Sequence, residues 1–358
     1  MKHKELSLLR LHNQCLGRQP FTLPEEVVRW MGAMQAQDYL GVLWAVALRT
    51  GKEITEADVE KAIGEGKIVR TWPMRGTLHL LAPEDVKWML ELLTPRILKS
   101  AAGRHRDLEL DKEIFMKSGN VFEKALSGEK HLTRDEMYTA LERSGISTEG
   151  QRGYHILWYW GQNGLICWGP RQGKQHTFVL LDEWVSGGKD LTGDEALDEL
   201  TRRYVRSHGP ITERDFAYWA GTTLTDARKG LEILGKEVEK VEIDGQNYFF
   251  TGDFDYKKVK GTVHLLPPFD EILTGYKDRS AVLKSQSTQS IILRNGIIKS
   301  IIVDREAVVG SWKRKLKKDK VEMEFEFFEE LSTTKRVKLE RMGRKYGRFL
   351  GRVAEWNL

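Results

Sequence analysis

The sequence predicts an α+β protein in which three tandem winged-helix motifs precede a small β-rich C-terminal domain with a closing helix. Helical patterns followed by a β-rich strand pair occur three times within residues 1–255. The residues beyond are dense in β-branched and aromatic side chains. The length of 358 residues suits roughly two or three domains. We expect winged helices at 1–105, 106–190 and 191–258 and the β-rich domain at 259–358.

The first motif combines amphipathic helices with a hairpin. Apolar residues recur at helical spacing from Leu6, and Thr22 with Pro24 marks the start of a second helix. After Gly64 and Gly66 the pattern changes to two β-rich runs. The expected helices are 6–16, one starting at Pro24, and 54–63, and the expected strands are 67–72 and 76–81.

The same order of elements recurs twice. In each copy the second helix follows a Thr that stands shortly before acidic residues, a helix N-cap signal, at Thr133 and at Thr212. The second copy should contain helices at 113–126, 133–143 and 150–162 and strands at 165–169 and 176–181. The third should contain helices at 194–207, after Thr212 and after Thr225, and strands at 237–242 and 246–251.

The C-terminal domain has a different pattern. Asn295-Gly296 is a strong hairpin signal between β-rich runs. The expected strands are 263–266, 290–293, 297–303, 306–315 and 321–328, and the closing helix is 334–353.

The composition excludes several classes of protein. With 40% hydrophobic and 30% charged residues, the chain is not globally disordered. Its two cysteines lie outside any CxxC pair, unlike the framework of a disulfide-rich secreted domain. There is neither an apolar signal core nor an apolar window of about 18 residues, so we expect a protein that is neither exported nor membrane-spanning.

Common catalytic motifs are absent from the sequence. It contains no GxxxxGK[ST] or GxGxxG loop to hold a nucleotide phosphate, and no GxSxG nucleophile elbow. The nine His residues form no HExxH or HxE…CxxC pattern. We therefore expect no metal, no nucleotide and no other cofactor.

Gln35 and Gln37 belong to the most distinctive short segment, which runs from Met34 to Asp38. Side chains two residues apart point roughly 200° apart around an α-helix but to the same side of an extended chain. If both amides face one pocket, the helix from Pro24 must end near Met34. The alternative is a polar helix end with solvated amides.

Asp270 and Glu271 form a second candidate site together with Lys277 and Arg279. Paired carboxylates close to cations suit either a chemical site or a salt-bridged loop. Composition alone leaves both interpretations open.

Basic residues are concentrated at one end of the chain. The net charge is only +5, yet residues 311–358 carry 14 basic and 8 acidic side chains. One basic run lies at 313–318 between two expected strands, and a second set shares one face of the closing helix. A single charged face is usually only solvated, but two basic clusters in one small domain are typical of phosphate binding.

The Gln segment, residues 70–79, and the runs 269–271 and 275–279 together resemble the winged-helix DNA glycosylases of the AlkZ/YcaQ type, over nearly the whole chain. The resemblance implies a concave DNA-binding surface, excision of N7-alkylated purines and unhooking of interstrand crosslinks. It also implies that Gln35 and Gln37 are the catalytic pair of the Gln-x-Gln branch. Asp38 lies one place beyond the acid of the Gln-x-Asp branch, and it joins Asp270, Glu271 and Arg279 as a secondary site candidate. The expected DNA contacts are Arg70, Arg75, Lys277, Lys313, Arg314, Lys315, Lys317, Lys318, Arg344 and Arg348.

Two neutral amides suit a hydrolysis in which the leaving group departs easily. Glutamine is not a base at neutral pH, but its carbonyl can orient a water molecule, and positioning suffices only when the leaving group is already good. Alkylation at N7 makes a purine such a leaving group, so we expect double-stranded DNA with alkylated purines as the partner and cationic lesions as the preferred substrate. No lysine stands beside the Gln pair in sequence, which predicts a monofunctional enzyme.

Two non-enzymatic interpretations compete with the glycosylase. A winged-helix transcriptional regulator would read DNA sequence through a recognition helix and would not need the Gln pair. A scaffold protein would use the basic helix to bind acidic partners. Three winged helices in one chain remove the usual need for a dimer, so we expect a monomer, located in the cytoplasm and associated with the nucleoid.

Overall fold

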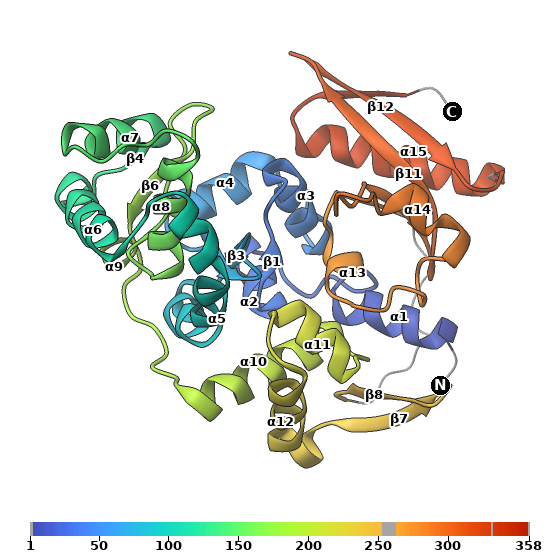
Figure 1. Cartoon of the computed structure of the whole chain (residues 1–358). Coiled ribbons are helices and arrows are strands. Elements are labelled where there is room, and N and C mark those ends of the chain that lie inside the picture. The colour runs from blue at the N-terminus through green and yellow to red at the C-terminus, as the bar shows by residue number, and fades with distance from the viewer. Residues whose placement is uncertain (1–2, 253–262, 331, 357–358) are drawn as a thin grey trace. The chain divides into compact units, whose positions relative to one another are not determined.

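The computed structural model describes residues 3–252, 263–330 and 332–356 of the chain. The chain divides into two compact units: unit 1 contains Met1–Val59 and Asp198–Leu358, and unit 2 contains Glu60–Leu197. Unit 2 is the stretch coloured from light blue to yellow-green in Figure 1. Each unit contains both helices and strands, which confirms the predicted mixed fold class.

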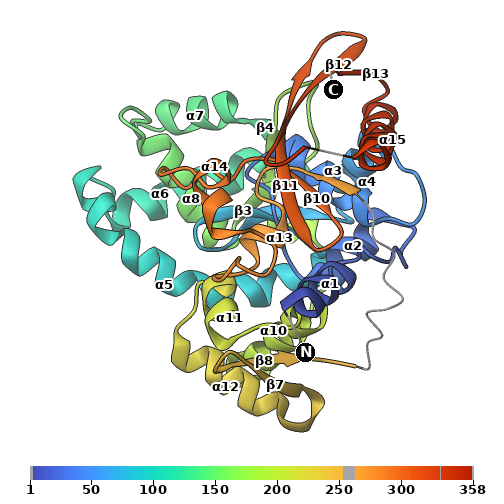
Figure 2. The same cartoon turned by 90° about the vertical axis from the view of Figure 1, so that its right-hand side faces the viewer.

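A five-stranded sheet forms the β-rich part of unit 1, in the order β13-β12-β11-β10-β9. Its strands are β9 (Val263–Leu266), β10 (Ile301–Asp304), β11 (Ala307–Leu316), β12 (Lys320–Phe327) and β13 (Val353–Trp356). Neighbours are antiparallel except β12 and β13, which are parallel. A parallel pair needs a crossover, and α15 (Thr333–Phe349) supplies it, lying beside the strands in Figure 2. The predicted β-rich end and closing helix are thus confirmed.

Trp44 anchors the helix α3 (Tyr39–Arg49) to this sheet. Its ring lies 5.0 Å from that of Tyr346 on α15, and its indole N–H donates a 2.7 Å hydrogen bond to the backbone oxygen of Leu265 on β9. Burial of a large ring with a satisfied N–H is favourable on both counts. The N-terminal end of α3, where the Gln segment joins it, is therefore held in place.

The rest of unit 1 is mainly helical. Capping boxes at Thr212 and Thr223 start α11 and α12, so the cap predicted at Thr225 in fact lies two residues earlier. Its helices include α1 (His3–Asn13), α2 (Pro24–Met31), α11 (Glu213–Ala220), α12 (Leu224–Leu234), α13 (Glu271–Thr274) and α14 (Thr288–Ile291), with short 3-10 turns at Gly235–Glu237 and Ser285–Ser287. Its remaining strands are β1 (Met34–Gln35), β7 (Glu239–Ile243) and β8 (Gln246–Phe250), while α4 (Glu56–Gly64) and α10 (Gly193–His208) cross the unit boundaries.

Unit 2 contains a sheet whose strands run in the order β3-β2-β5-β6-β4. The hairpins β2–β3 and β5–β6 are both antiparallel, and Arg70 pairs with Trp168 where they join. The strands are β2 (Val69–Met74), β3 (Thr77–Leu81), β4 (Leu132–Thr133), β5 (Ile166–Trp168) and β6 (Thr177–Leu180). The helices are α5 (Val86–Asp107), α6 (Lys112–Leu126), α7 (Arg134–Arg143), α8 (Arg152–Gln162) and α9 (Leu181–Trp184), with a 3-10 turn at Pro83–Asp85.

All three predicted strand pairs of residues 1–255 are present as β2–β3, β5–β6 and β7–β8. The number of winged-helix motifs and the domain boundaries stay predictions, and the boundary expected at 258/259 lies outside the described residues. In the described part of the chain, no helix is both long and apolar enough to cross a membrane.

Three predictions for the C-terminal region were wrong. The strand expected at 297–303 begins only at Ile301, as β10. Residues 290–293 do not form a strand, because Thr288–Ile291 is the short helix α14 and only an isolated bridge joins Ile292 to Ile298 around the Asn295-Gly296 turn. The closing helix ends at Phe349 rather than near residue 353, where β13 begins.

Candidate active site

The Gln segment is an extended stretch between two helices. Helix α2 ends at Met31, and Gly32 follows with a positive φ of 77°, a conformation that glycine adopts easily. The helix therefore ends before Met34, as required if both amides are to face the same way. Met34 and Ala36 are buried, whereas Gln35 is partly exposed and Gln37 exposed. This alternation puts both amides on the accessible side of the segment.

Asp38 fixes the end of this segment. Its Oδ1 accepts a 2.6 Å hydrogen bond from the backbone N–H of Gly41, which makes Asp38 the N-cap of α3. The same oxygen accepts a 2.7 Å hydrogen bond from the guanidinium of Arg314 on β11. Asp38 thus fixes where the chain turns from the Gln segment into the helix.

Glu271 supports the Gln segment from behind. The backbone N–H of Gln35 donates a 2.8 Å hydrogen bond to Glu271 Oε1, and the indole N–H of Trp219 donates a 3.1 Å bond to Oε2. His208 Nε2 lies 3.4 Å from the same Oε2. Burial lowers the pKa of His208, against the opposing effect of Glu271. Since Glu271 is only 1% exposed, this carboxylate positions the backbone of Gln35 rather than facing solvent.

Asp270 belongs to a buried ion pair. Its two oxygens accept hydrogen bonds of 2.8 and 2.9 Å from the guanidinium of Arg49 at the end of α3. The side chain of Gln14 accepts a 3.1 Å bond from Arg49 and donates a 3.2 Å bond to the backbone oxygen of Glu271. These contacts join the chain just after α1 to α3 and α13, so Asp270 stabilises the structure that supports the site.

Arg279 and Lys277 lie around the ring of Tyr218. The guanidinium of Arg279 donates to the backbone oxygen of Leu273 at 2.7 Å and to the Tyr218 hydroxyl at 2.9 Å. Lys277 is exposed, with its Nζ 5.5 Å from the Tyr218 ring centroid. Lys277 is therefore accessible to a nucleic acid, whereas Arg279 is engaged in holding its own loop.

The predicted DNA contacts on β11 lie opposite acidic residues of β12. Lys313 pairs with Glu324 and Lys315 with Glu322 in the antiparallel register, which places opposite charges side by side. The exposed cations of this hairpin are Lys313, Lys315, Lys317 and Lys318. The strand pair is therefore less basic than the run 313–318 suggests, and the turn that ends it carries the excess charge.

The remaining predicted DNA contacts differ in exposure. Arg344 and Arg348 on α15 are exposed, at 3.3 Å from Glu340 and 2.7 Å from Glu53. In unit 2, Arg75 lies in the β2–β3 turn, 3.3 Å from His79 Nε2.

Arg70 is only 4% exposed and lies 5.0 Å over the ring of Trp168. This packing gives no support to a direct contact between Arg70 and a phosphate.

Among the residues that the structure describes, no group of three or more His, Cys, Asp or Glu is arranged to hold a metal ion. The side chains near the Gln segment that could bind a metal, Glu271 and His208, instead contact other protein groups: Glu271 accepts from the Gln35 backbone, and His208 Nε2 lies 3.4 Å from Glu271. The arrangement can present two neutral amides to a substrate and hold their backbone firmly.

The family described as "DNA glycosylase AlkZ-like" matches residues 28–349, which include the whole Gln segment and the Glu271 region. The chain belongs to this family. A Streptomyces sahachiroi protein named interstrand DNA cross-link repair glycosylase is 27% identical over 326 residues, covering 85% of each chain. The solved structure of the Streptomyces sahachiroi DNA glycosylase AlkZ shares the fold, with a TM-score of 0.80 at 23% identity over all of both chains.

Membership of the AlkZ-like family makes this protein a DNA glycosylase, which decides against the non-enzymatic regulator and the scaffold. The sequence did not single out four residues that support the Gln segment: Gln14, Arg49, His208 and Trp219. Only Arg49 carries a local signal, because it is a charged residue at the end of the apolar run 42–48.

Proposed function

We propose that this glycosylase hydrolyses the N-glycosidic bond of N7-alkylated purines in double-stranded DNA, with a water molecule oriented by Gln35 and Gln37. One observation carries the proposal: both amides lie on the accessible side of an extended segment whose backbone Glu271 holds. Fixed amides suit orientation of a water molecule, since they cannot deprotonate it.

The reaction balances without a strong acid or base. The water oxygen bonds to C1′ while the bond from C1′ to the base nitrogen breaks, through a state with oxocarbenium character. The bonding electrons go to the base, where they neutralise the charge that N7 alkylation placed on the purine. The water proton is released to solvent. Orientation of the water can contribute up to about 7–11 kcal/mol in ideal cases.

The same reasoning makes uracil a poor substrate, because it is uncharged and leaves as an anion unless it is protonated. It also makes the enzyme monofunctional, because neither an amide nor the carboxylate of Glu271 can form an imine with C1′. A covalent adduct trapped with borohydride would contradict this second point.

Interstrand crosslinks joined through purine N7 contain the same cationic leaving group, so we extend the proposal to their unhooking. Support comes from the name of the relative that is 27% identical and from the exposure of Gln37. An exposed amide can reach a base that is too bulky or too constrained to enter a closed pocket. Separation of the strands of a crosslinked duplex on a denaturing gel measures this activity.

Exposed cations would hold the DNA, and the best placed are Lys277, Lys317, Lys318 and Arg344. Each neutralised phosphate contributes nearly one unit to the slope of log affinity against log salt. Replacing Lys317 and Lys318 together with alanine should lower that slope by up to about two units. We expect one protein chain per DNA site, which light scattering of the free protein and of the complex would test.

Incubation with a duplex containing 7-methylguanine, followed by alkaline cleavage, tests the central proposal. Gln35→Ala and Gln37→Ala should each lower excision by about 100-fold or more and leave DNA binding largely unchanged. Gln289→Ala, which removes an exposed amide on α14, is the matched control and should keep full activity. Equal excision of uracil and 7-methylguanine, or loss of binding in step with activity, would contradict the proposed role of the pair.

A further inference from the structure

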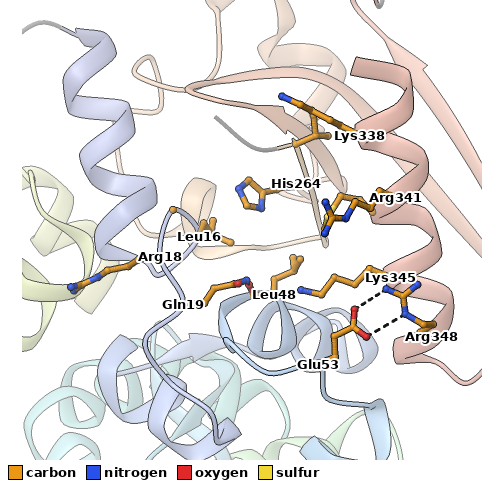
Figure 3. A pocket seen from close by; sticks show the side chains of 13 residues that line it. Leu16, Arg18, Gln19, Leu48, Glu53, His264, Lys338, Arg341, Lys345 and Arg348 are labelled. Carbon is orange, nitrogen blue, oxygen red and sulfur yellow. Dashed lines mark hydrogen bonds and ion pairs between the residues drawn. The ribbon is translucent and has the colours of Figure 1, made fainter. Parts of the chain in front are cut away.

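A cationic pocket of about 480 Å³ lies in unit 1, away from the Gln segment (Figure 3). It is bordered by the chain after α1, the C-terminal end of α3, the start of β9 and one face of α15. Its charged lining consists of Arg18, Glu53, Lys338, Arg341, Lys345 and Arg348. Five cations thus line the pocket together with one carboxylate, so the lining has a large positive excess.

The helix α15 supplies most of this charge. Lys338, Arg341, Lys345 and Arg348 follow one another at intervals of three and four residues, which places them on one face. Like charges at these spacings repel one another and destabilise a helix. Glu53 is the one carboxylate among the residues that line the pocket, and it pairs with Arg348 at 2.7 Å.

Arg341 and Lys345 are the best placed of these cations. In Figure 3 both side chains extend from α15 into the pocket, with Lys345 pointing toward Leu48, whereas Arg18 extends away from it. Arg18 instead lies 5.3 Å over the ring of Trp30. Burial lowers the pKa of Lys345, and the neighbouring Arg348 and Arg341 lower it further against the effect of Glu53. An anion between Arg341 and Lys345 would relieve this repulsion.

The rest of the lining is apolar or neutral. Leu16, Leu48, Val263 and Met342 supply apolar surface, and His264 lies at the start of β9. Burial lowers the pKa of His264 to about 4, so this side chain is neutral at physiological pH. The volume falls within the range of small-ligand sites, so the pocket has room for an anionic group with an attached sugar or base.

We propose that this pocket binds a phosphate group, which Arg341 and Lys345 hold against the apolar surface. Arginine offers a planar fork that matches phosphate oxygens, and lysine adds a compact charge. The proposal does not depend on the proposed reaction, because α3 separates the pocket from the Gln segment by 11 residues, or about 16 Å. The phosphate has two possible sources, a free phosphorylated compound or the DNA backbone at a distance from the lesion.

Titration calorimetry of the full chain with inorganic pyrophosphate and with AMP tests the proposal. We expect saturable, salt-sensitive binding to the wild type and at least a tenfold loss in the double variant Arg341→Ala/Lys345→Ala. Arg336→Ala removes an exposed cation of the same helix outside the pocket and should bind as the wild type does. Gln35→Ala should also keep its affinity, which separates this test from that of the reaction.

The charge-preserving variant Arg341→Lys/Lys345→Arg guards against a folding artefact and should retain most of the affinity. The alanine variant should be at least as stable as the wild type, because it removes repulsion. No saturable binding of either probe to the wild type, or equal affinity in the alanine variant, would overturn the proposal.

Competition distinguishes the two sources of phosphate. If pyrophosphate displaces an undamaged duplex in fluorescence anisotropy, and the double variant also binds that duplex more weakly, the pocket holds a backbone phosphate. If pyrophosphate binds without displacing the duplex, the pocket serves a free phosphorylated compound. Either result supports a phosphate site.

Discussion

Replacing Glu271 with glutamine tests whether this carboxylate positions the Gln segment. The substitution keeps the size of the side chain but turns one acceptor oxygen into a donor NH₂. The wild-type oxygens accept from the Gln35 backbone at 2.8 Å and from the Trp219 indole at 3.1 Å. An amide has one acceptor oxygen, so either the Gln35 N–H or the Trp219 N–H must then face another donor.

The expected effect follows from that lost bond. A buried hydrogen bond to a charged group contributes about 1.5–3 kcal/mol. If this energy holds Gln35 in its reactive position, the activation barrier rises by a similar amount. Each 1.36 kcal/mol is a factor of ten in rate, so the rate constant for base release should fall by about 10- to 100-fold.

Single-turnover release of 7-methylguanine from a duplex, measured at saturating enzyme, gives this rate constant directly. Duplex affinity should stay within about twofold of the wild type, which separates positioning from DNA binding. Asp270→Asn is the matched control, because it weakens a neighbouring buried carboxylate that does not touch the Gln segment. If Glu271→Gln keeps the wild-type rate constant, or loses activity only in proportion to its unfolded fraction, the positioning role is refuted.

Three further predictions concern stability. Asp38→Ala removes the cap of α3 and the partner of Arg314, and it should lower the free energy of unfolding by about 1–2 kcal/mol in urea titrations; an unchanged midpoint would contradict the capping role. Arg49→Met should cost about 3–5 kcal/mol because it leaves Asp270 buried without its partner, whereas Arg49→Met/Asp270→Leu should recover much of this loss; equal loss in both variants would show that the ion pair is not the cause. Burial lowers the folded-state pKa of His264 from 6.5 to about 4, so the unfolded chain binds the proton first and stability should fall as pH drops from about 6.5 to 4. His264→Asn should reduce that fall by at most about 1.4 kcal/mol per pH unit, and an identical acid dependence in both proteins would count against it.

The sequence predicts well those elements that carry local signals. The capping box at Thr133 and the β-rich runs at 67–72 and 76–81 are visible in a few adjacent residues, and α7 and the β2–β3 hairpin form there. The end of α2 before Met34 is likewise anticipated, because two amides at this spacing can face one way only in an extended chain.

Elements with a uniform pattern are harder to predict. Helix α3 is buried along most of its length, so its apolar residues show no amphipathic period, and the sequence did not reveal it. The run 290–293 contains two β-branched residues, yet its first two residues belong to the helical turn α14 and Ile292 forms only an isolated bridge, because β-propensity is a weak local preference.

The supports of the candidate site could not be predicted at all. Asp270 and Glu271 stand next to each other and look alike in sequence, yet one pairs with Arg49 and the other holds the Gln35 backbone. Their partners lie more than 200 residues away along the chain, and no local pattern carries that information.

The division of the chain into units has a consequence for synthesis. Unit 1 combines the first 59 residues with those from Asp198 onward, so the Gln segment is translated 236 residues before the carboxylate that holds it. At about 5–20 residues per second, a ribosome needs roughly 10 to 50 seconds to make that stretch. A nascent chain that stops before Glu271 therefore has the two amides but not their support. The proposed water-orienting arrangement can therefore form only after about three quarters of the polypeptide has been synthesised.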